Sequence, residues 1–189
     1  FTQSGPHFPD FAAYFAALEA SPAAVNTACL CGHSNLRHAT MSELNRAARD
    51  DEIAAMCALL KQALEQGALG LSTGTYYPTA AAAPTAELVA IAKTLQAYGG
   101  VYVTHMRNEE DAVVSSIEET LHIGREAGVP VVISHHKCMS EPNHGKSEIT
   151  LGLIDEARHS QAVGLDVYPY TASSTILQPE RVAKCARVV

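Results

Sequence analysis

The segments Val101-Tyr-Val-Thr-His105 and Val131-Val-Ile-Ser-His135 decide the fold that this sequence predicts. Each is a short run rich in β-branched residues that follows a glycine-containing turn signal and ends in histidine. A helix-sized segment lies between them. Parallel strands joined by a helix end at the same edge of a sheet, where α/β proteins place their chemistry. We therefore expect His105 and His135 to lie close together, and imidazole is the commonest protein metal ligand.

Similar runs recur along the chain and alternate with helical patterns. The predicted strands are Ala28–Gly32, Ala68–Thr73, Val101–His105, Val131–His135 and Val163–Tyr168. The predicted helices are Met41–Gln66, Pro84–Tyr98, Glu109–Ala127 and Lys146–Gln161, and Gly128 is typical of the position after a helix end. This alternation predicts an α/β fold with a parallel sheet.

The number of βα units selects between two α/β architectures. A complete (β/α)₈ barrel needs about 250 residues, so five units in residues 1–189 predict a single domain that is an incomplete (β/α)₈ TIM-type barrel. A doubly wound sheet is the alternative. It usually carries a glycine-rich phosphate loop after its first strand, and the segment 70–74 (Gly-Leu-Ser-Thr-Gly) does not have that pattern.

Composition excludes several classes of protein. The 189 residues are 47% hydrophobic with a net charge of −7, which suits a domain with a real core and disfavours nucleic acid as a partner. No apolar run reaches the length needed to cross a membrane. The five cysteines are scattered without a CxxC pair, which favours reduced thiols in a cytoplasmic protein. The chain begins without Met or a signal-peptide pattern, and we interpret it as a piece of a longer protein.

The alternation of side chains along a strand makes a prediction about which histidine points inward. His105 should share a face with Val103, and His135 with Ile133, while His136 faces the helices or the next strand. Imidazoles on neighbouring strands could converge on one ion, but a catalytic zinc site takes three protein ligands. Two ordinary histidines near strand ends are therefore the alternative interpretation.

Five stretches of the sequence carry a more specific signal. They are Cys31-Gly-His-Ser-Asn-Leu-Arg37, Gly67-Ala-Leu-Gly-Leu-Ser-Thr-Gly-Thr-Tyr-Tyr-Pro78, Gly99-Gly-Val-Tyr-Val-Thr-His-Met-Arg107, Gly128-Val-Pro-Val-Val-Ile-Ser-His-His-Lys137 and Leu165-Asp-Val-Tyr-Pro-Tyr170. In this order and spacing, the motifs THMR, ISHHK and DxYPY are far more specific than any one of them. The chain resembles the N-acyl-D-amino-acid deacylases (D-aminoacylases) of the amidohydrolase superfamily.

The resemblance implies a distorted (β/α)₈ barrel with Zn²⁺ at its carboxyl face, held by His105 and His135. The substrate-binding residues that it implies are Lys137, Tyr168, Ser174 and Tyr76. The family's His-x-His pair and cysteine ligand would lie before Phe1, and its catalytic aspartate beyond Val189. We therefore expect no catalytic residue within this chain, and the isolated 189 residues to be inactive.

Other polar residues have more ordinary interpretations. Arg107 is expected to form a structural ion pair with Glu109, Glu110 or Asp111, and His33 to be a loop or polar-network residue. The stretch Cys138–Lys146 is predicted to be a mobile loop over the site. The histidines expected at the surface are His7, His38, His122, His144 and His159.

The resemblance implies a function for the intact protein, namely zinc-dependent hydrolysis of the amide bond of N-acyl-D-amino acids. The partner would be this small-molecule substrate, with the oligomeric state left open. A dihydroorotase-like or hydantoinase-like cyclic amidase is one alternative. A non-catalytic fragment or pseudoenzyme that keeps the scaffold for interaction is the other.

Overall fold

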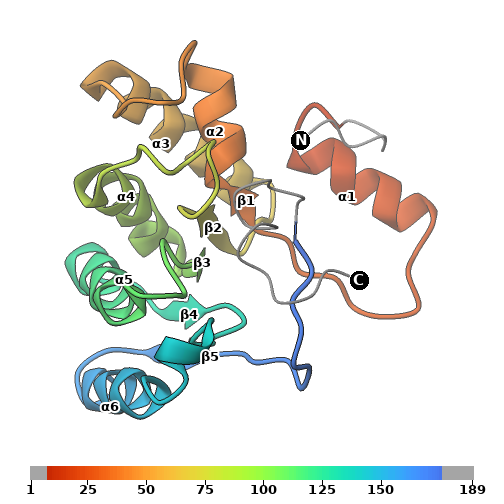
Figure 1. Ribbon diagram of the computed structural model, residues 1–189. Coiled ribbons are helices and arrows are strands. Elements are labelled where there is room, and N and C mark those ends of the chain that lie inside the picture. Colours follow the sequence, from red (N-terminus) through yellow and green to blue (C-terminus); the bar gives the residue numbers. More distant parts are fainter. Residues whose placement is uncertain (1–7, 176–189) are drawn as a thin grey trace.

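The computed structural model describes residues 8–175, which form one parallel sheet with helices packed mainly on one side (Figure 1). The strands follow the order β1-β2-β3-β4-β5, so neighbours in the sheet are also neighbours along the chain. Their bounds are β1 (Cys31–Gly32), β2 (Gly70–Gly74), β3 (Val101–His105), β4 (Val131–Ile133) and β5 (Val163–Leu165). Repeated βα units produce this sequential order.

The helices connect the strands and cover one face of the sheet. Their bounds are α1 (Phe11–Ala20), α2 (His33–Thr40), α3 (Asp50–Glu65), α4 (Thr85–Ala92), α5 (Val113–Ala127) and α6 (Ser147–Ala157), with 3₁₀ helices η1 (Lys93–Tyr98) and η2 (Glu141–Asn143). Helices α3 to α6 lie side by side on one face, and α1 lies on the opposite side (Figure 1). The predicted α/β class with a parallel sheet is confirmed.

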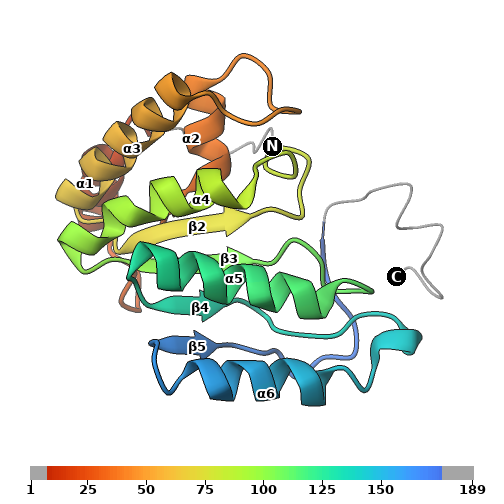
Figure 2. The ribbon, with the colours of Figure 1, turned by 90° about the vertical axis from the view of Figure 1, so that its left-hand side faces the viewer.

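The residues of β3 alternate between the two faces of the sheet. Tyr102 and Thr104 are buried beneath the helices, whereas Val101, Val103 and His105 are only partly buried on the other face. The strands run in the same direction, so their carboxyl ends and the loops that follow meet at one edge (Figure 2). The predicted placement of His105 at that edge, on the face of Val103, is confirmed.

The prediction of which β4 residues share a face of the sheet with His105 was wrong. The register pairs Val131 with Tyr102 and Ile133 with Thr104, so both β4 residues lie on the buried, helix-covered face. The partly buried Val132 is the β4 residue on the face of His105. A run of three apolar residues has no alternation that could reveal its facing, so the pattern alone left this open.

Several element boundaries also differ from the predictions. Strands β1, β4 and β5 are shorter than predicted, and the predicted helix Met41–Gln66 is wrong because only its second part is helical. Segment 41–49 is held outside the helix by distant groups. Arg37 donates to the carbonyls of Leu44 and Arg46, and the N–H of Ala48 donates to Glu87.

Glycines end the helical segments where the chain turns back toward the sheet. Gly99 follows η1 with φ of 61°, and Gly128 follows α5 with φ of 67°, as predicted for Gly128. Both lie in the left-handed region, which glycine adopts without a steric cost. These turns position the start of β3 and β4.

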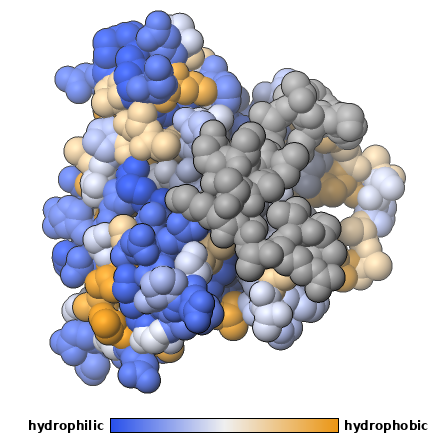
Figure 3. Space-filling model, viewed as in Figure 1, coloured by the Kyte–Doolittle hydropathy of each residue, from blue (hydrophilic) through white to orange (hydrophobic). Residues whose placement is uncertain are grey.

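The hydrophobic core lies between the sheet and the helices. Its fully buried members include Leu60, Leu71, Leu88, Ile117 and Ile133. Hydrophilic residues predominate on the surface over α3 to α6 (Figure 3). Among residues 8–175, no helix combines the length and apolar character that crossing a membrane requires.

Within residues 8–175 the sheet is open. Strands β1 and β5 are its edges and do not pair with each other. The arrangement is the one expected of part of a (β/α)₈ barrel. Closure into a barrel, and the single-domain organisation of residues 1–189, stay predictions.

Candidate metal centre

His105 is the last residue of β3, and its ring lies at the carboxyl edge of the sheet. The rings of Tyr76 and Tyr77, from the loop after β2, pack against it with centroid distances of 5.1 and 5.0 Å. Burial lowers the pKa of His105 to about 4, which favours the neutral ring that a metal ion requires. Its Nε2 atom is buried and has no hydrogen-bond partner among residues 8–175.

His135 lies two residues beyond the end of β4, and its backbone has a φ of 41°. This left-handed conformation ends the strand alternation and explains why the ring reaches His105 although Ile133 faces the helices. Asp166, which follows β5, stabilises the turn because its Oδ1 accepts the N–H of His135 at 2.7 Å. Positive φ is uncommon for residues other than glycine, and it occurs often at functional sites.

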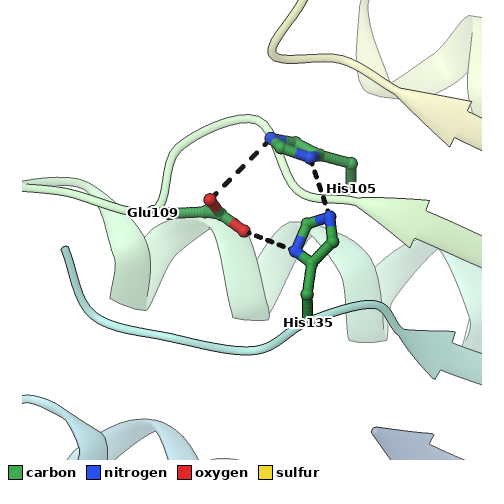
Figure 4. A group of neighbouring side chains, drawn as sticks. All are labelled: His105, Glu109 and His135. Carbon is green, nitrogen blue, oxygen red and sulfur yellow. Dashed lines mark hydrogen bonds and ion pairs between the residues drawn. The ribbon is translucent and has the colours of Figure 1, made fainter. Parts of the chain in front are cut away.

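The two rings face each other through specific atoms. The Nδ1 of His105 and the Nε2 of His135 are 3.0 Å apart, and the ring centroids are 4.6 Å apart (Figure 4). Two nitrogens bound to one tetrahedral zinc ion at about 2.1 Å each lie about 3.4 Å apart. The observed separation and the donor types fit a shared zinc ion.

Glu109 is the third member of this group, and the sequence analysis missed it as a site residue. One potential ligand atom from each of His105, Glu109 and His135 lies within 4.8 Å of the others. The Oε1 of Glu109 is 3.0 Å from His135 Nδ1, and its Oε2 is 3.9 Å from His105 Nε2. The sequence does contain one signal for Glu109, because its carboxylate lies four residues after His105 at the end of a predicted strand.

The charge of Glu109 is stabilised by its neighbours. Burial acts to raise the pKa of this carboxyl, but hydrogen bonds from His135 and Lys137 outweigh it and hold the pKa below its usual value. The Lys137 Nζ lies 2.7 Å from Glu109 Oε1. A buried ionised carboxylate is stable only with such partners.

The structure brings two of the four predicted substrate-binding residues to one cleft of about 280 Å³, whose lining includes His136 but neither His105 nor His135. Lys137 and Tyr168 line this cleft, with the lysine Nζ 5.5 Å from the tyrosine ring centre. Burial, followed by the charge of Glu109, raises the pKa of Tyr168. Tyr76 lies against His105, as given above, whereas Ser174 is exposed and is not among the residues that line the cleft.

Arg107 forms a structural ion pair, but the predicted partners were wrong. It pairs with Glu119 of α5 at 2.8 Å rather than with residues 109–111. It also donates to the carbonyls of Ala81 and Ala83. Both carbonyls belong to the loop that carries Tyr76, so Arg107 holds this loop near His105.

His33 and His136 have structural environments. His33 begins α2, is fully buried and contacts Glu87 at 3.1 Å, which confirms the predicted polar network. The ring of His136 contacts Thr150 of α6 at 3.0 Å, so of the two predicted environments it has that of the helices rather than that of the next strand. His38, His122, His144 and His159 are exposed, as predicted, and His7 lies outside the described residues.

The loop after β4 contains local structure and hydrogen bonds to the rest of the site. The stretch Cys138–Lys146 contains η2, and the N–H of Met139 donates to the carbonyl of Glu109 at 2.6 Å. The side chain of Asn143 donates to Asp111 and to the carbonyl of Met139. These bonds anchor the loop at the edge of the site.

The cysteines show no ligand cluster among the described residues. Cys29, Cys31, Cys57 and Cys138 are free thiols, and Cys185 lies outside the described range. Burial raises the pKa of Cys31 to about 11, which keeps that thiol protonated and unreactive.

The chain is similar to known proteins over almost its whole length. The chain is 53% identical over 182 residues to a D-aminoacylase from Alcaligenes xylosoxydans xylosoxydans, covering 96% of this chain and 38% of the relative. It is 48% identical over 183 residues to an N-acyl-D-aspartate deacylase from the same organism, covering 96% of this chain and 37% of that relative. No model of a known protein family matches the sequence.

A solved structure agrees in fold as well. The N-acyl-D-glutamate deacylase from Bordetella bronchiseptica, complexed with zinc and a phosphonate inhibitor, superposes with a TM-score of 0.92 at 46% identity. The superposition covers 96% of this chain and 38% of that protein. A D-aminoacylase whose crystal structure is described as defining a novel subset of amidohydrolases superposes with a TM-score of 0.84 at 49% identity, covering 90% of this chain and 39% of that one. The fold therefore places this chain among the amidohydrolases.

Within that class, the chain belongs to the family of the N-acyl-D-amino-acid deacylases. The resemblance seen in the sequence motifs is confirmed. The chain spans somewhat more than a third of the length of these relatives, 38% of the D-aminoacylase.

Proposed function

We propose that the intact protein carrying this sequence is a zinc-dependent hydrolase that cleaves the amide bond of N-acyl-D-amino acids. The observation that carries the proposal is the pair of facing nitrogens, His105 Nδ1 and His135 Nε2, 3.0 Å apart at the carboxyl edge of the sheet. The family gives the substrate class, because the relatives are deacylases of N-acyl-D-amino acids. The zinc complex of the N-acyl-D-glutamate deacylase supports the choice of metal.

His105 and His135 would hold the zinc ion, with Glu109 beside both rings. When bound, zinc would polarise the amide carbonyl and lower the pKa of a water molecule. The aspartate implied by the family resemblance, outside these 189 residues, would act as general base.

The residues that line the cleft would orient the substrate. The ammonium of Lys137 and the hydroxyl of Tyr168 would bind the substrate carboxylate, since both line one cleft and the Nζ of Lys137 lies 3.0 Å from His135 Nδ1. Tyr76 would line the pocket for the substrate side chain, and Ser174 stays a candidate further along the chain. A small-molecule substrate and a cytoplasmic location, without nucleic acid or membrane partners, complete the proposal.

The test measures bound zinc and the release of free amine from N-acetyl-D-amino acids, with the L-enantiomers as a stereochemical control. We expect His105→Ala and His135→Ala to lower zinc affinity and turnover together, by more than the roughly 10- to 100-fold that loss of an outer partner of a metal ligand costs. The exposed His159 is the matched control, and His159→Ala should leave both unchanged.

Two results would count against the proposal. A His105→Ala variant that keeps both zinc and turnover would show that the metal site is misassigned. An intact protein that binds no metal and cleaves no N-acetyl-D-amino acid would favour the non-catalytic scaffold instead.

A further inference from the structure

We propose that Glu109 is a positioning residue whose single carboxylate orients both the metal-binding His135 and the substrate-binding Lys137. This inference rests on the proposed function. The carboxylate is almost completely buried, with a side-chain exposure of 4%, and it lies at the junction of the two groups. It comes from the segment between β3 and α5, so it joins the β3 and β4 ends of the site.

The ring geometry separates the metal-facing atoms from the Glu109-facing atoms. His105 Nδ1 and His135 Nε2 face each other, whereas His135 Nδ1 and His105 Nε2 face the two oxygens of Glu109 (Figure 4). A metal-binding imidazole usually donates its other N–H to a carboxylate or carbonyl. Glu109 would therefore fix His135 with its proton on Nδ1 and its lone pair on Nε2, toward His105.

The same oxygen also holds the lysine. The Nζ of Lys137 is 2.7 Å from Glu109 Oε1, and it donates to the carbonyl of His135 at 3.0 Å. His135 Nδ1 and Lys137 Nζ are themselves 3.0 Å apart. With Nδ1 protonated, both groups are donors, and an acceptor that they share holds them side by side.

The backbone of Glu109 ties the β4 loop to the same point. Its carbonyl accepts the N–H of Met139 at 2.6 Å, two residues after Lys137. The segment from His135 to Met139 thus contacts Glu109 at three points, namely the His135 ring, the Lys137 ammonium and the Met139 backbone N–H. A substitution of Glu109 should therefore weaken the binding of both the metal and the substrate. A substitution of Lys137 should weaken the binding of the substrate alone.

The experiment compares Glu109→Gln with Lys137→Met in the intact protein, measuring zinc affinity by chelator competition and kcat and KM separately. Glutamine keeps the size of the side chain but removes its charge. We expect Glu109→Gln to weaken zinc binding by about 10- to 100-fold and to raise KM, while saturating zinc still restores full metal content. Lys137→Met should raise KM and leave zinc affinity unchanged.

Controls and contrary results separate positioning from other roles. Glu110→Gln, a partly exposed neighbouring carboxylate, should change neither quantity. If saturating zinc does not restore the full metal content of Glu109→Gln, Glu109 is a metal ligand and the proposal is overturned. Unchanged zinc affinity with unchanged KM would overturn it as well.

A further measurement does not depend on the proposed function. In the metal-free wild type, the ¹⁵N chemical shifts of the His135 ring should show a proton on Nδ1. In Glu109→Gln, they should show that this proton has moved to Nε2 or exchanges between the two nitrogens. The same tautomer in both proteins would refute the orienting role even if the wild type is an active enzyme. A protein that hydrolyses no N-acyl-D-amino acid but shows the tautomer change would refute only the proposed function.

Discussion

At the scale of single residues, the buried cation Arg37 shows how the loops around the site are held. Its side chain has no solvent exposure, and it pairs with the equally buried Glu87. It also donates to the carbonyls of Thr79, Leu44 and Arg46. One guanidinium thus joins the loop before α3 to the loop after β2, and it can do so because its donors form a rigid fork.

Removing Arg37 should be costly because Glu87 would keep an uncompensated buried charge. Burial acts to raise the pKa of Glu87, and hydrogen bonds from His33 and Arg37 hold the pKa below its usual value instead. We expect Arg37→Met to lower the free energy of unfolding by about 3–5 kcal/mol, measured by urea denaturation. Arg158→Met, at an exposed pair, should change it by less than about 0.5 kcal/mol.

A companion variant tests the reason for the loss. Glu87→Gln combined with Arg37→Met removes both charges, so the double variant should be less unstable than the sum of the single ones. Additive losses would show that the two residues act independently.

At the scale of elements, α5 packs onto β4 closely enough that one position requires glycine. A Cβ built on Gly124 would lie 2.1 Å from Cγ2 of Val131, a buried strand residue. At Gly152, in the middle of α6, no heavy atom of the described part of the chain lies within 4 Å of such a Cβ. The two glycines are therefore a matched pair, one required by packing and one not.

The Gly-to-Ala substitution should have opposite effects at these positions. Gly124→Ala should lower the free energy of unfolding by about 1–3 kcal/mol because α5 and β4 must separate. Gly152→Ala should raise it by about 0.5–1 kcal/mol because alanine favours the helix. Thermal and urea unfolding would measure both, and a stabilising Gly124→Ala would contradict the close packing.

At the scale of the whole molecule, the carboxylates and histidines whose pKa values are shifted in the site and the core act in one direction. The pKa values of Glu87, Glu109, Glu119 and His136 are lowered, Glu52 is lowered to about 2 and His105 to about 4. A lowered pKa in the folded state means that the unfolded chain binds more protons at intermediate pH. Stability therefore falls as the pH falls.

We expect the metal-free protein to lose stability in two ranges of pH. His105 contributes from the ordinary histidine value of 6.5 down to about 4, and Glu52 from the ordinary glutamate value of 4.5 down to about 2. The lowered pKa values of His136 and of the other carboxylates act in the same direction. Urea midpoints at pH 7.5, 5 and 3, with a chelator present, should decrease in that order. Glu52→Gln should reduce the loss below pH 4.5, and midpoints that stay level or rise with acid would refute the assignment.

The sequence by itself determined the βα alternation, the parallel sheet and the placement of two histidine-ended segments at one edge. These features are local, because β-branched runs, turn glycines and helical periodicity act over a few residues. The family motifs are also read directly from the chain. The metal and substrate roles of His105, His135, Lys137, Tyr168, Ser174 and Tyr76 stay predictions.

Only the tertiary structure decided which groups meet. Glu87 lies 50 residues from Arg37 along the chain, and their pairing kept segment 41–49 out of a helix that its sequence pattern favoured. Asp166, 31 residues from His135, holds the positive φ that turns this ring toward His105. Contacts over such separations depend on the packing of the whole sheet, so local sequence patterns cannot specify them.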